Sequence, residues 1–269
     1  MPDIVANGIR FHYIDCGSGT AMFWLHGLCG SSDAWRDTMS HFRDRFHVIA
    51  YDARGHGLSE NPENPDAYSQ DSMLDDLRAI MDGLDINQAI IGGHSMGAGV
   101  ALNFALHYPD RCLGLVLVGI GSGGSNPRWW QQWWDKLADL AENKGMSAVL
   151  EEMNSLPAWQ SAFRNSQIGN QVSEEIMRNC AKSIAYTIRG IQRKRPPIFE
   201  LESRLKECRT NTLVVMSEYD TPVKDSSQFI AKCMPNAVLK VLPARSHWTF
   251  REAPEKFLKV VDDFLTHLL

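Results

Sequence analysis

Short apolar runs alternate along the chain with longer stretches in which apolar residues recur at helical spacing. The short runs are rich in Val, Ile and Leu at consecutive positions, which is typical of parallel strands covered by helices on both faces. We expect strands at residues 9–15, 21–25, 47–51, 89–91, 113–118, 212–216 and 238–242. Helical spacing is clear at residues 72–84, 96–107 and 254–268. This order predicts an α/β fold with an open, mostly parallel sheet. The Asn7-Gly8 pair predicts a hairpin at the start of this sheet.

One segment interrupts this alternation. From about residue 125 to residue 207 the pattern is helical and predicts no strand. Pro157 and the Pro196-Pro197 pair mark breaks within it. We therefore predict a core domain formed by residues 1–124 and 208–269, with an all-helical domain, residues 125–207, inserted between two strands of its sheet.

Four tryptophans stand close together near the start of this insertion. Their spacing gathers them on one side of a helix, and such a stripe usually packs against the domain beneath it. Four indoles within six residues cannot all point inward, so we expect one or two of them to line a substrate pocket. The four candidates are Trp129, Trp130, Trp133 and Trp134.

Composition excludes several classes of protein. The 269 residues are 44% hydrophobic and 22% charged, which is ordinary for a globular protein. A net charge of −5 does not favour nucleic acid as a partner, because phosphate binding needs a basic face. No apolar run is long enough to span a bilayer, and the first residues show no secretory pattern, so we expect a cytoplasmic protein with no membrane insertion. Nothing in the sequence indicates an oligomeric state.

The six cysteines are scattered along the chain. They form no CxxC pair and have no metal-ligand spacing, so we expect no metal site. A disulfide framework is typical of short secreted chains, which favours free thiols here.

The segment Gly93-His94-Ser95-Met96-Gly97 has the pattern G-x-S-x-G. The pattern alone arises by chance in roughly one such chain in ten, but here it follows a predicted strand and opens a predicted helix. A serine at this sharp turn is exposed at the carboxyl end of the sheet. Ser95 is therefore the candidate nucleophile, and the Met96 N–H is a candidate donor to an oxyanion.

A second donor is expected after a neighbouring strand. The strand at 21–25 runs into His26-Gly27-Leu28, and the backbone N–H of Leu28 is the candidate. Taken alone, this His-Gly pair is more typical of an ordinary strand-to-loop turn.

A serine hydroxyl is a weak nucleophile until a base takes its proton. His247 follows the strand at 238–242 in a loop expected at the same sheet edge as Ser95, and it is the candidate base. His94 adjoins the serine and is expected on the wrong side of the turn. His56 lies in a glycine-rich turn, and spacing alone leaves it open.

The base needs a carboxylate to orient it. Asp220 follows the strand at 212–216, which neighbours the strand before His247, and it is the candidate acid. Glu218 is the local alternative, but it lies closer to the strand body. The loop that starts at Gly119 contains no carboxylate.

A run of basic residues lies near the end of the insertion. Its members are Arg189, Arg193, Lys194 and Arg195. The ordinary interpretation is a solvated face. The alternative is that the run steers a carboxylated substrate.

Taken together, these segments resemble the α/β-hydrolase superfamily over essentially the whole chain. The resemblance rests on His26-Gly27-Leu28, the turn at 52–59, the Ser95 segment, and Ser246-His247 ahead of Glu252-Ala253-Pro254, in the order serine, acid, histidine. It implies that the helical insertion is a cap over the active site and that no cofactor is needed. It also implies a structural role for Arg54 and His56 in the turn at 52–59.

The resemblance implies a serine hydrolase that cleaves carboxylic ester or lactone bonds of small, largely apolar molecules through an acyl-enzyme. Because this fold hosts many chemistries, other serine-triad activities stay open: carbon–carbon bond hydrolysis of ring-cleavage products, perhydrolysis, and the lyase-type synthase reaction of menaquinone biosynthesis. A non-catalytic binding protein is a further alternative. Haloalkane dehalogenases and epoxide hydrolases of this fold carry an aspartate where this chain has Ser95, which argues against both.

Overall fold

The computed structural model describes residues 2–121 and 127–268, and its centre is one twisted sheet. The strands follow the order β1-β2-β4-β3-β5-β6-β7-β8. β1 and β2 run antiparallel to their neighbours, and β3 to β8 are parallel to one another. The predicted fold class is thereby confirmed. The strands are β1 (Asp3–Ala6), β2 (Ile9–Cys16), β3 (Thr20–Leu25), β4 (Phe46–Tyr51), β5 (Ala89–His94), β6 (Cys112–Val118), β7 (Thr212–Ser217) and β8 (Ala237–Leu242).

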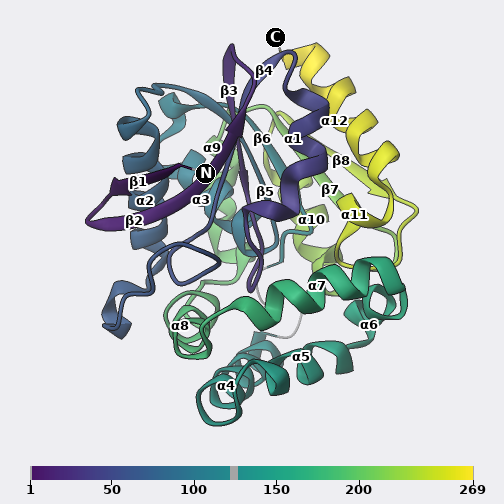
Figure 1. Ribbon diagram of the computed structural model, residues 1–269. Helices are drawn as coiled ribbons and strands as arrows, with labels where there is room; N and C mark the ends of the chain where they lie inside the picture. Colours follow the sequence, from purple (N-terminus) through teal and green to yellow (C-terminus); the bar gives the residue numbers. More distant parts are fainter. Residues whose placement is uncertain (1, 122–126, 269) are drawn as a thin grey trace.

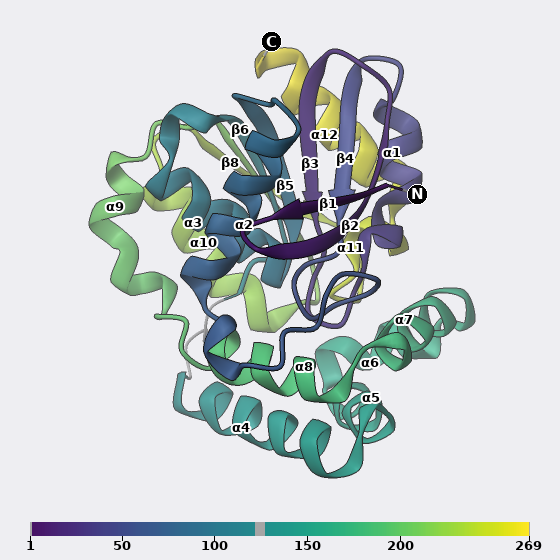
Figure 2. The same ribbon diagram turned by 60° about the vertical axis from the view of Figure 1, so that its left-hand side comes forward.

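Helices cover both faces of this sheet (Figures 1 and 2). On one face lie α1 (Arg36–Phe42), the short α11 (Thr249–Glu252) and α12 (Pro254–Leu268). On the other lie α2 (Gln70–Gly83), α3 (Met96–His107) and α10 (Thr221–Cys233). Each face therefore buries its own apolar cluster, which explains why the central strands are apolar at consecutive positions.

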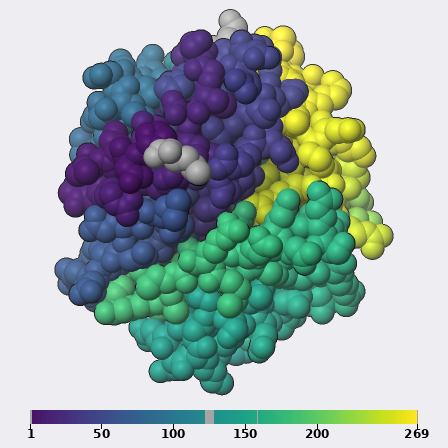
Figure 3. All heavy atoms as spheres, in the orientation of Figure 1, coloured from purple at the N-terminus to yellow at the C-terminus, as the bar shows by residue number. Residues whose placement is uncertain are grey.

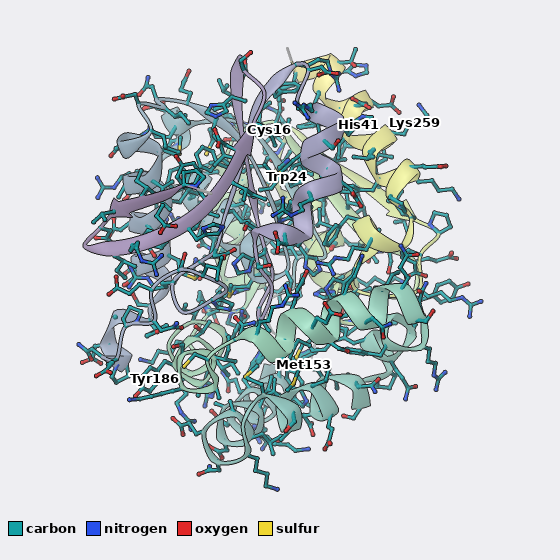
Figure 4. All side chains as sticks on the ribbon, viewed as in Figure 1. Cys16, Trp24, His41, Met153, Tyr186 and Lys259 are labelled. Atoms are coloured by element: carbon teal, nitrogen blue, oxygen red, sulfur yellow. The ribbon has the colours of Figure 1, made fainter. Side chains whose placement is uncertain are left out.

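Strand β3 illustrates this two-sided burial. Phe23 and Trp24 are adjacent, point to opposite faces and are both fully buried. Trp24, labelled in Figure 4, packs with its ring centre 4.6 Å from that of Trp35. Because successive side chains of a strand alternate between faces, every position from Ala21 to Leu25 is used for packing.

Between β6 and β7 the described residues are helical and irregular, without a strand. Five helices of this segment lie beneath the carboxyl ends of the parallel strands, and their buried apolar residues are continuous with one apolar cluster of the core (Figures 1 and 3). They are α4 (Pro127–Lys144), α5 (Met146–Ser155), α6 (Pro157–Arg164), α7 (Ser166–Arg178) and α8 (Ala181–Thr187). A π-helical turn (Ile188–Gln192) follows α8, and α9 (Glu202–Glu207) leads back to the sheet. We call α4 to α8 and the π-turn the cap helices.

The predicted start of the insertion, at residue 125, lies outside the described residues. The division into two domains stays a prediction. All six cysteines are free thiols, as expected. Within residues 2–121 and 127–268, no helix has both the length and the apolar character required to cross a bilayer.

Candidate active site

Ser95 occupies the sharp turn between β5 and α3. Its backbone has φ +52° and ψ −106°, a conformation that is costly for a residue with a side chain. The backbones around it approach so closely that a Cβ at Gly93 would lie 2.5 Å from the Gly97 oxygen, and one at Gly97 would lie 2.3 Å from the Leu25 oxygen. The two glycines are therefore required by packing, and the turn holds Ser95 at the carboxyl edge of the sheet.

His247 and Asp220 reach the same edge from the loops after β8 and β7. The His247 Nδ1 lies 2.5 Å from Asp220 Oδ2, and the two residues are 5% and 0% exposed. An ionised carboxylate can only accept, so Nδ1 carries the proton and Nε2 is left as the basic nitrogen. Within the described part of the chain Nε2 has no hydrogen-bond partner, and His247 lines the same cavities as Ser95.

The residues that competed for these roles lie elsewhere. Glu218 is exposed, although it is only two residues from Asp220. His94 packs behind the candidate base, where its Nε2 donates to the His247 carbonyl oxygen at 3.0 Å. Burial lowers the pKa of His94 well below its ordinary value, so this ring is a neutral support. His56 points its Nδ1 at the Arg54 carbonyl oxygen and does not line the cavity.

The two candidate oxyanion donors belong to adjacent loops. Met96 is the first residue of α3, so the helix offers its N–H no partner. Leu28 lies in a tight turn that Gly30 N–H closes onto the Gly27 oxygen at 3.0 Å. Among the described residues neither N–H forms a hydrogen bond, which leaves both able to bind a developing negative charge.

The Leu28 turn is held in place by a buried histidine. His26 Nε2 accepts from the Ala53 N–H at 2.9 Å, while Nδ1–H donates to the Gly27 oxygen at 2.7 Å. Only a neutral imidazole can accept at one nitrogen and donate at the other. Burial lowers the pKa of His26 to about 4, which keeps the ring neutral at physiological pH.

The turn at 52–59 is a second structural anchor. Asp52 accepts from the Ser32 N–H at 2.6 Å and from the Leu58 N–H at 2.8 Å. The guanidinium of Arg54 forms a buried ion pair with Asp76 at 2.5 Å. Neither Asp52 nor Arg54 lines a cavity that contains Ser95, so the turn supports the loops around the site.

Two cavities meet at Ser95 and His247, between the carboxyl edge of the sheet and the cap. The larger, about 70 Å³, has Arg195 in its wall and is called the Arg195 cavity. The smaller, about 30 Å³, contains Leu28 and is called the Leu28 cavity. Trp134 and Trp159 line both. Met153 of α5, labelled in Figure 4, lies in the wall of the Leu28 cavity and shows that the cap closes this space from below.

Of the four tryptophans at the start of the insertion, two line a cavity and two do not. Trp130 and Trp134, one helical turn apart, line the Arg195 cavity. The other two candidates do not. Trp133 is 5% exposed, donates its indole N–H to Glu152 at 2.9 Å and packs inside the cap, whereas Trp129 is 43% exposed at the outer edge of α4. Successive helical residues turn by about 100°, so the side of α4 that carries Trp130, Gln131 and Trp134 faces the cavity and the side chains of Trp129 and Trp133 do not line it.

Sequence reasoning missed Trp159. This residue of α6 stacks on His247, with ring centres 5.6 Å apart and planes inclined by 29°. It is 7% exposed and lies in the walls of both cavities. It lies two residues after Pro157, which the sequence marked only as a break, and no pattern in the sequence indicated that the helix starting there faces the base.

The four residues of the basic run differ in their partners. On the face of α4, Arg189 pairs with Asp139 and Glu142, and Arg193 pairs with Asp135. Lys194 is exposed. Arg195 has no carboxylate partner within the described residues, and both it and Arg193 line the Arg195 cavity. Within the described residues no group of three or more His, Cys, Asp or Glu side chains is placed to hold a metal ion.

Comparison with known proteins agrees with this fold. The family model of the α/β-hydrolase fold matches residues 20–254, so the chain belongs to that family. It is 29% identical over 270 residues, 98% of this chain and 97% of the relative, to a protein of Bacillus subtilis (strain 168) with the provisional name 2-succinyl-6-hydroxy-2,4-cyclohexadiene-1-carboxylate synthase.

Two further proteins show how varied these relatives are. Epoxide hydrolase 1 of Caenorhabditis elegans is 24% identical over 274 residues, 96% of this chain and 68% of that protein. The crystal structure of the enol-lactonase from Burkholderia xenovorans LB400 superposes with a TM-score of 0.86 at 23% identity, covering 98% of this chain and 100% of that one. The fold is therefore shared across different reactions, and the reaction of this chain has to be argued from its own site.

Proposed function

We propose that this protein is a serine hydrolase that cleaves carboxylic ester or lactone bonds of small molecules through an acyl-enzyme. The observation that carries the proposal is the buried pair of Asp220 and His247, beside cavities that His247 and Ser95 both line; within the described structure the His247 Nε2 has no hydrogen-bond partner. This combination of acid, base and hydroxyl is what nucleophilic acyl transfer requires.

In the proposed reaction Ser95 Oγ attacks the carbonyl carbon while His247 Nε2 takes the hydroxyl proton. The N–H groups of Leu28 and Met96 bind the oxyanion, and each contributes about 3 kcal/mol to lowering the barrier. His247 then gives its proton to the leaving alkoxide. A water molecule, deprotonated by the same nitrogen, attacks the acyl-enzyme and releases the acid.

Packing supports the orientation of the base in this mechanism. The His247 ring is held between Trp159 on one side and His94, whose ring centre lies 4.6 Å away. His94 also binds the His247 carbonyl oxygen, so backbone and ring are both fixed. Because proton transfer depends on geometry, a base fixed in this way loses little entropy on reaching the transition state.

The size of the site favours small substrates. At about 70 Å³ the Arg195 cavity holds roughly five water molecules. Trp130, Trp134 and Trp159 make much of its wall apolar. This supports a short, largely apolar acyl or alkyl group as the part of the substrate that enters the cap.

A second candidate function is supported by the Bacillus subtilis relative, which aligns over 98% of this chain. A synthase of the lyase type would use the same His247 to remove a proton from carbon, with no acyl-enzyme. The epoxide hydrolase relative carries less weight, because Ser95 stands where an aspartate nucleophile is expected in that branch.

The test is covalent labelling with a fluorophosphonate, together with turnover on p-nitrophenyl esters, lactones and vinylogous diketones. Wild type is expected to be labelled at Ser95 and to hydrolyse the esters or lactones. Ser95→Ala is expected to lose both properties with an unchanged melting temperature, while Ser155→Ala, an exposed serine of the cap, keeps them. Labelling that survives Ser95→Ala would refute the nucleophile, and a wild type that is never labelled would favour the lyase or a binding protein.

A further inference from the structure

Arg195 owes its position to an irregular turn in the cap. After α8 the chain forms the π-turn, in which Arg193 N–H donates to the Ile188 oxygen five residues back at 2.8 Å. The extra residue in such a turn rotates the chain that follows, and π-turns are frequent at functional sites. Both Arg193 and Arg195 line the Arg195 cavity, but Arg193 pairs with Asp135 on α4.

The guanidinium of Arg195 has no anionic partner among the residues that the structure describes. It donates to Gln192 Oε1 at 2.9 Å and to the Gly121 carbonyl oxygen at 3.3 Å, both of which are neutral. Its Nε is buried and has no acceptor in the described chain. Arg189 and Arg193 of the same run are neutralised by carboxylates, so Arg195 alone of these three brings an uncompensated charge into the site.

This charge persists at physiological pH. Burial lowers the pKa of Arg195 to about 10, which still leaves the guanidinium protonated near neutrality. Arg195 is half-buried, and a cation that is partly removed from water without an anionic partner costs folding stability. Such a group is therefore more readily explained by a ligand than by stability.

The charge also lies close to the candidate nucleophile. A Cβ at Gly99 would lie 2.7 Å from Arg195 Nη1, so the guanidinium occupies the space that the missing side chain leaves. The Gly99 N–H donates to the backbone carbonyl oxygen of Ser95 at 3.1 Å, so Gly99 lies one turn of α3 from Ser95. Four residues of helix rise about 6 Å, so a molecule attached to Ser95 can reach Arg195 with a short chain.

The Leu28 cavity offers no comparable charge. Its arginine, Arg251, forms an ion pair with Glu175 at 2.5 Å, and both line that cavity. This ion pair compensates the charge of Arg251, so the pair offers an anionic substrate group no net positive charge there. A negatively charged group is therefore directed to the Arg195 cavity, while the neutral half of the substrate is left for the Leu28 cavity.

We propose that Arg195 binds a carboxylate on the acyl half of the substrate, so that the substrates are monoesters or lactone acids with roughly two to four carbon atoms between this carboxylate and the reacting carbonyl. The inference rests on the proposed hydrolysis at Ser95 and refines it. Arg195 contacts the substrate, and Gln192 positions the guanidinium through its Oε1.

The first experiment compares esters that differ only in charge. Mono-p-nitrophenyl succinate is paired with p-nitrophenyl butyrate, and the adipate monoester with the hexanoate, because in each pair a carboxylate replaces a methyl group. For each enzyme the measured quantity is the ratio of kcat/KM for the charged ester to that for the neutral one. Wild type is expected to favour the charged ester, and Arg195→Met to lower the ratio about 10- to 100-fold, chiefly through KM.

Two other variants test whether a change in this ratio comes from a direct contact between Arg195 and the substrate. Arg189→Met removes a cap charge that is paired on α4 and does not line the cavity, so its ratio should stay within about twofold of wild type. Arg195→Lys keeps the charge but loses the planar fork, and should retain part of the preference. If Arg189→Met abolishes the preference as Arg195→Met does, the effect is a long-range field and the assignment to Arg195 is wrong.

The second experiment separates this inference from the proposed hydrolysis. Ser95→Ala cannot form an acyl-enzyme, so calorimetry can measure its equilibrium binding of monomethyl succinate and of methyl butyrate. Tighter binding of the charged ester, lost in Ser95→Ala/Arg195→Met, would support the carboxylate site even if wild type hydrolysed no ester. Equal binding of both esters, or an affinity difference that survives Arg195→Met, would overturn the carboxylate site and leave the hydrolysis proposal standing.

Discussion

Replacing Asp220 by asparagine tests the proposed mechanism with the smallest change of shape. The carboxylate is fully buried, its Oδ2 lies 2.5 Å from His247 Nδ1, and its Oδ1 has no partner in the described structure. Asp220 also precedes α10, but its side chain makes no capping hydrogen bond there. The substitution should therefore leave the fold intact.

The expected magnitude follows from the direction of one hydrogen bond. The asparagine amide donates to Nδ1, which makes Nδ1 the acceptor and leaves the proton on Nε2, where it cannot take the Ser95 proton. The imidazolium that forms in the transition state also loses its counter-charge. In serine enzymes this tautomer change lowers kcat by about 10⁴-fold, which corresponds to about 5.4 kcal/mol at 1.36 kcal/mol for each tenfold.

The assay is kcat on p-nitrophenyl butyrate, with melting curves for every variant. Glu218→Gln makes the same chemical change two residues away on an exposed side chain, and it should alter kcat by no more than about threefold. If Glu218→Gln were the crippled variant and Asp220→Asn the active one, Glu218 would be the acid. If neither variant lost activity, His247 would not be a base oriented by a carboxylate.

Two other expectations concern the cap and the buried histidines. Trp130→Ala and Trp134→Ala should lower kcat/KM by a factor that grows from acetyl to butyryl to hexanoyl esters, and for the largest ester the loss of transition-state binding should be about 1–3 kcal/mol. Trp133→Ala should instead cost about 3–5 kcal/mol of folding stability, and its effect on activity should not depend on acyl size. Identical profiles for all three variants would show that the Arg195 cavity does not bind the acyl group. The pKa values of His26 and His56 are lowered by burial to about 4 and about 3, so the unfolded chain takes up protons below about pH 6.5 while the folded chain stays neutral there. Stability should therefore fall as the pH drops from 6.5 towards 4, by about 1.4 kcal/mol per pH unit for each histidine, and a urea midpoint that is constant from pH 7.5 to 4.5 would contradict this.

The sequence predicted the elements well where an apolar pattern ends at a clear breaker. The helices expected at 96–107 and 254–268 coincide with α3 and α12. The strand expected at 89–91 was three residues too short, because Gly92, Gly93 and His94 break the apolar pattern although all three are buried in β5. Their burial comes from close packing of neighbouring backbones and of Trp24 over Gly92, which no local pattern encodes.

The placement of side chains in the cap depends on how its helices are rotated. A run of tryptophans or arginines fixes the composition of a helix but not which ridge faces the sheet. Trp133 and Trp134 are neighbours, yet one packs inside the cap and the other lines both cavities. Arg193 pairs with a carboxylate of α4, whereas Arg195 has no carboxylate partner among the described residues, and no feature of the sequence predicted the π-turn that precedes them.

This contrast divides the site into two parts with different origins. Ser95, Asp220 and His247 follow strands β5, β7 and β8, and the carboxyl ends of parallel strands meet at one edge, so strand order alone predicts that loops after them converge. Arg195, Trp134 and Trp159 come from the cap, where the cavity wall is set by helix packing against that edge. The proposed chemistry therefore depends on the sheet and the proposed substrate preference on the cap. It follows that cap variants should change which ester is preferred while the same three core residues carry out the reaction.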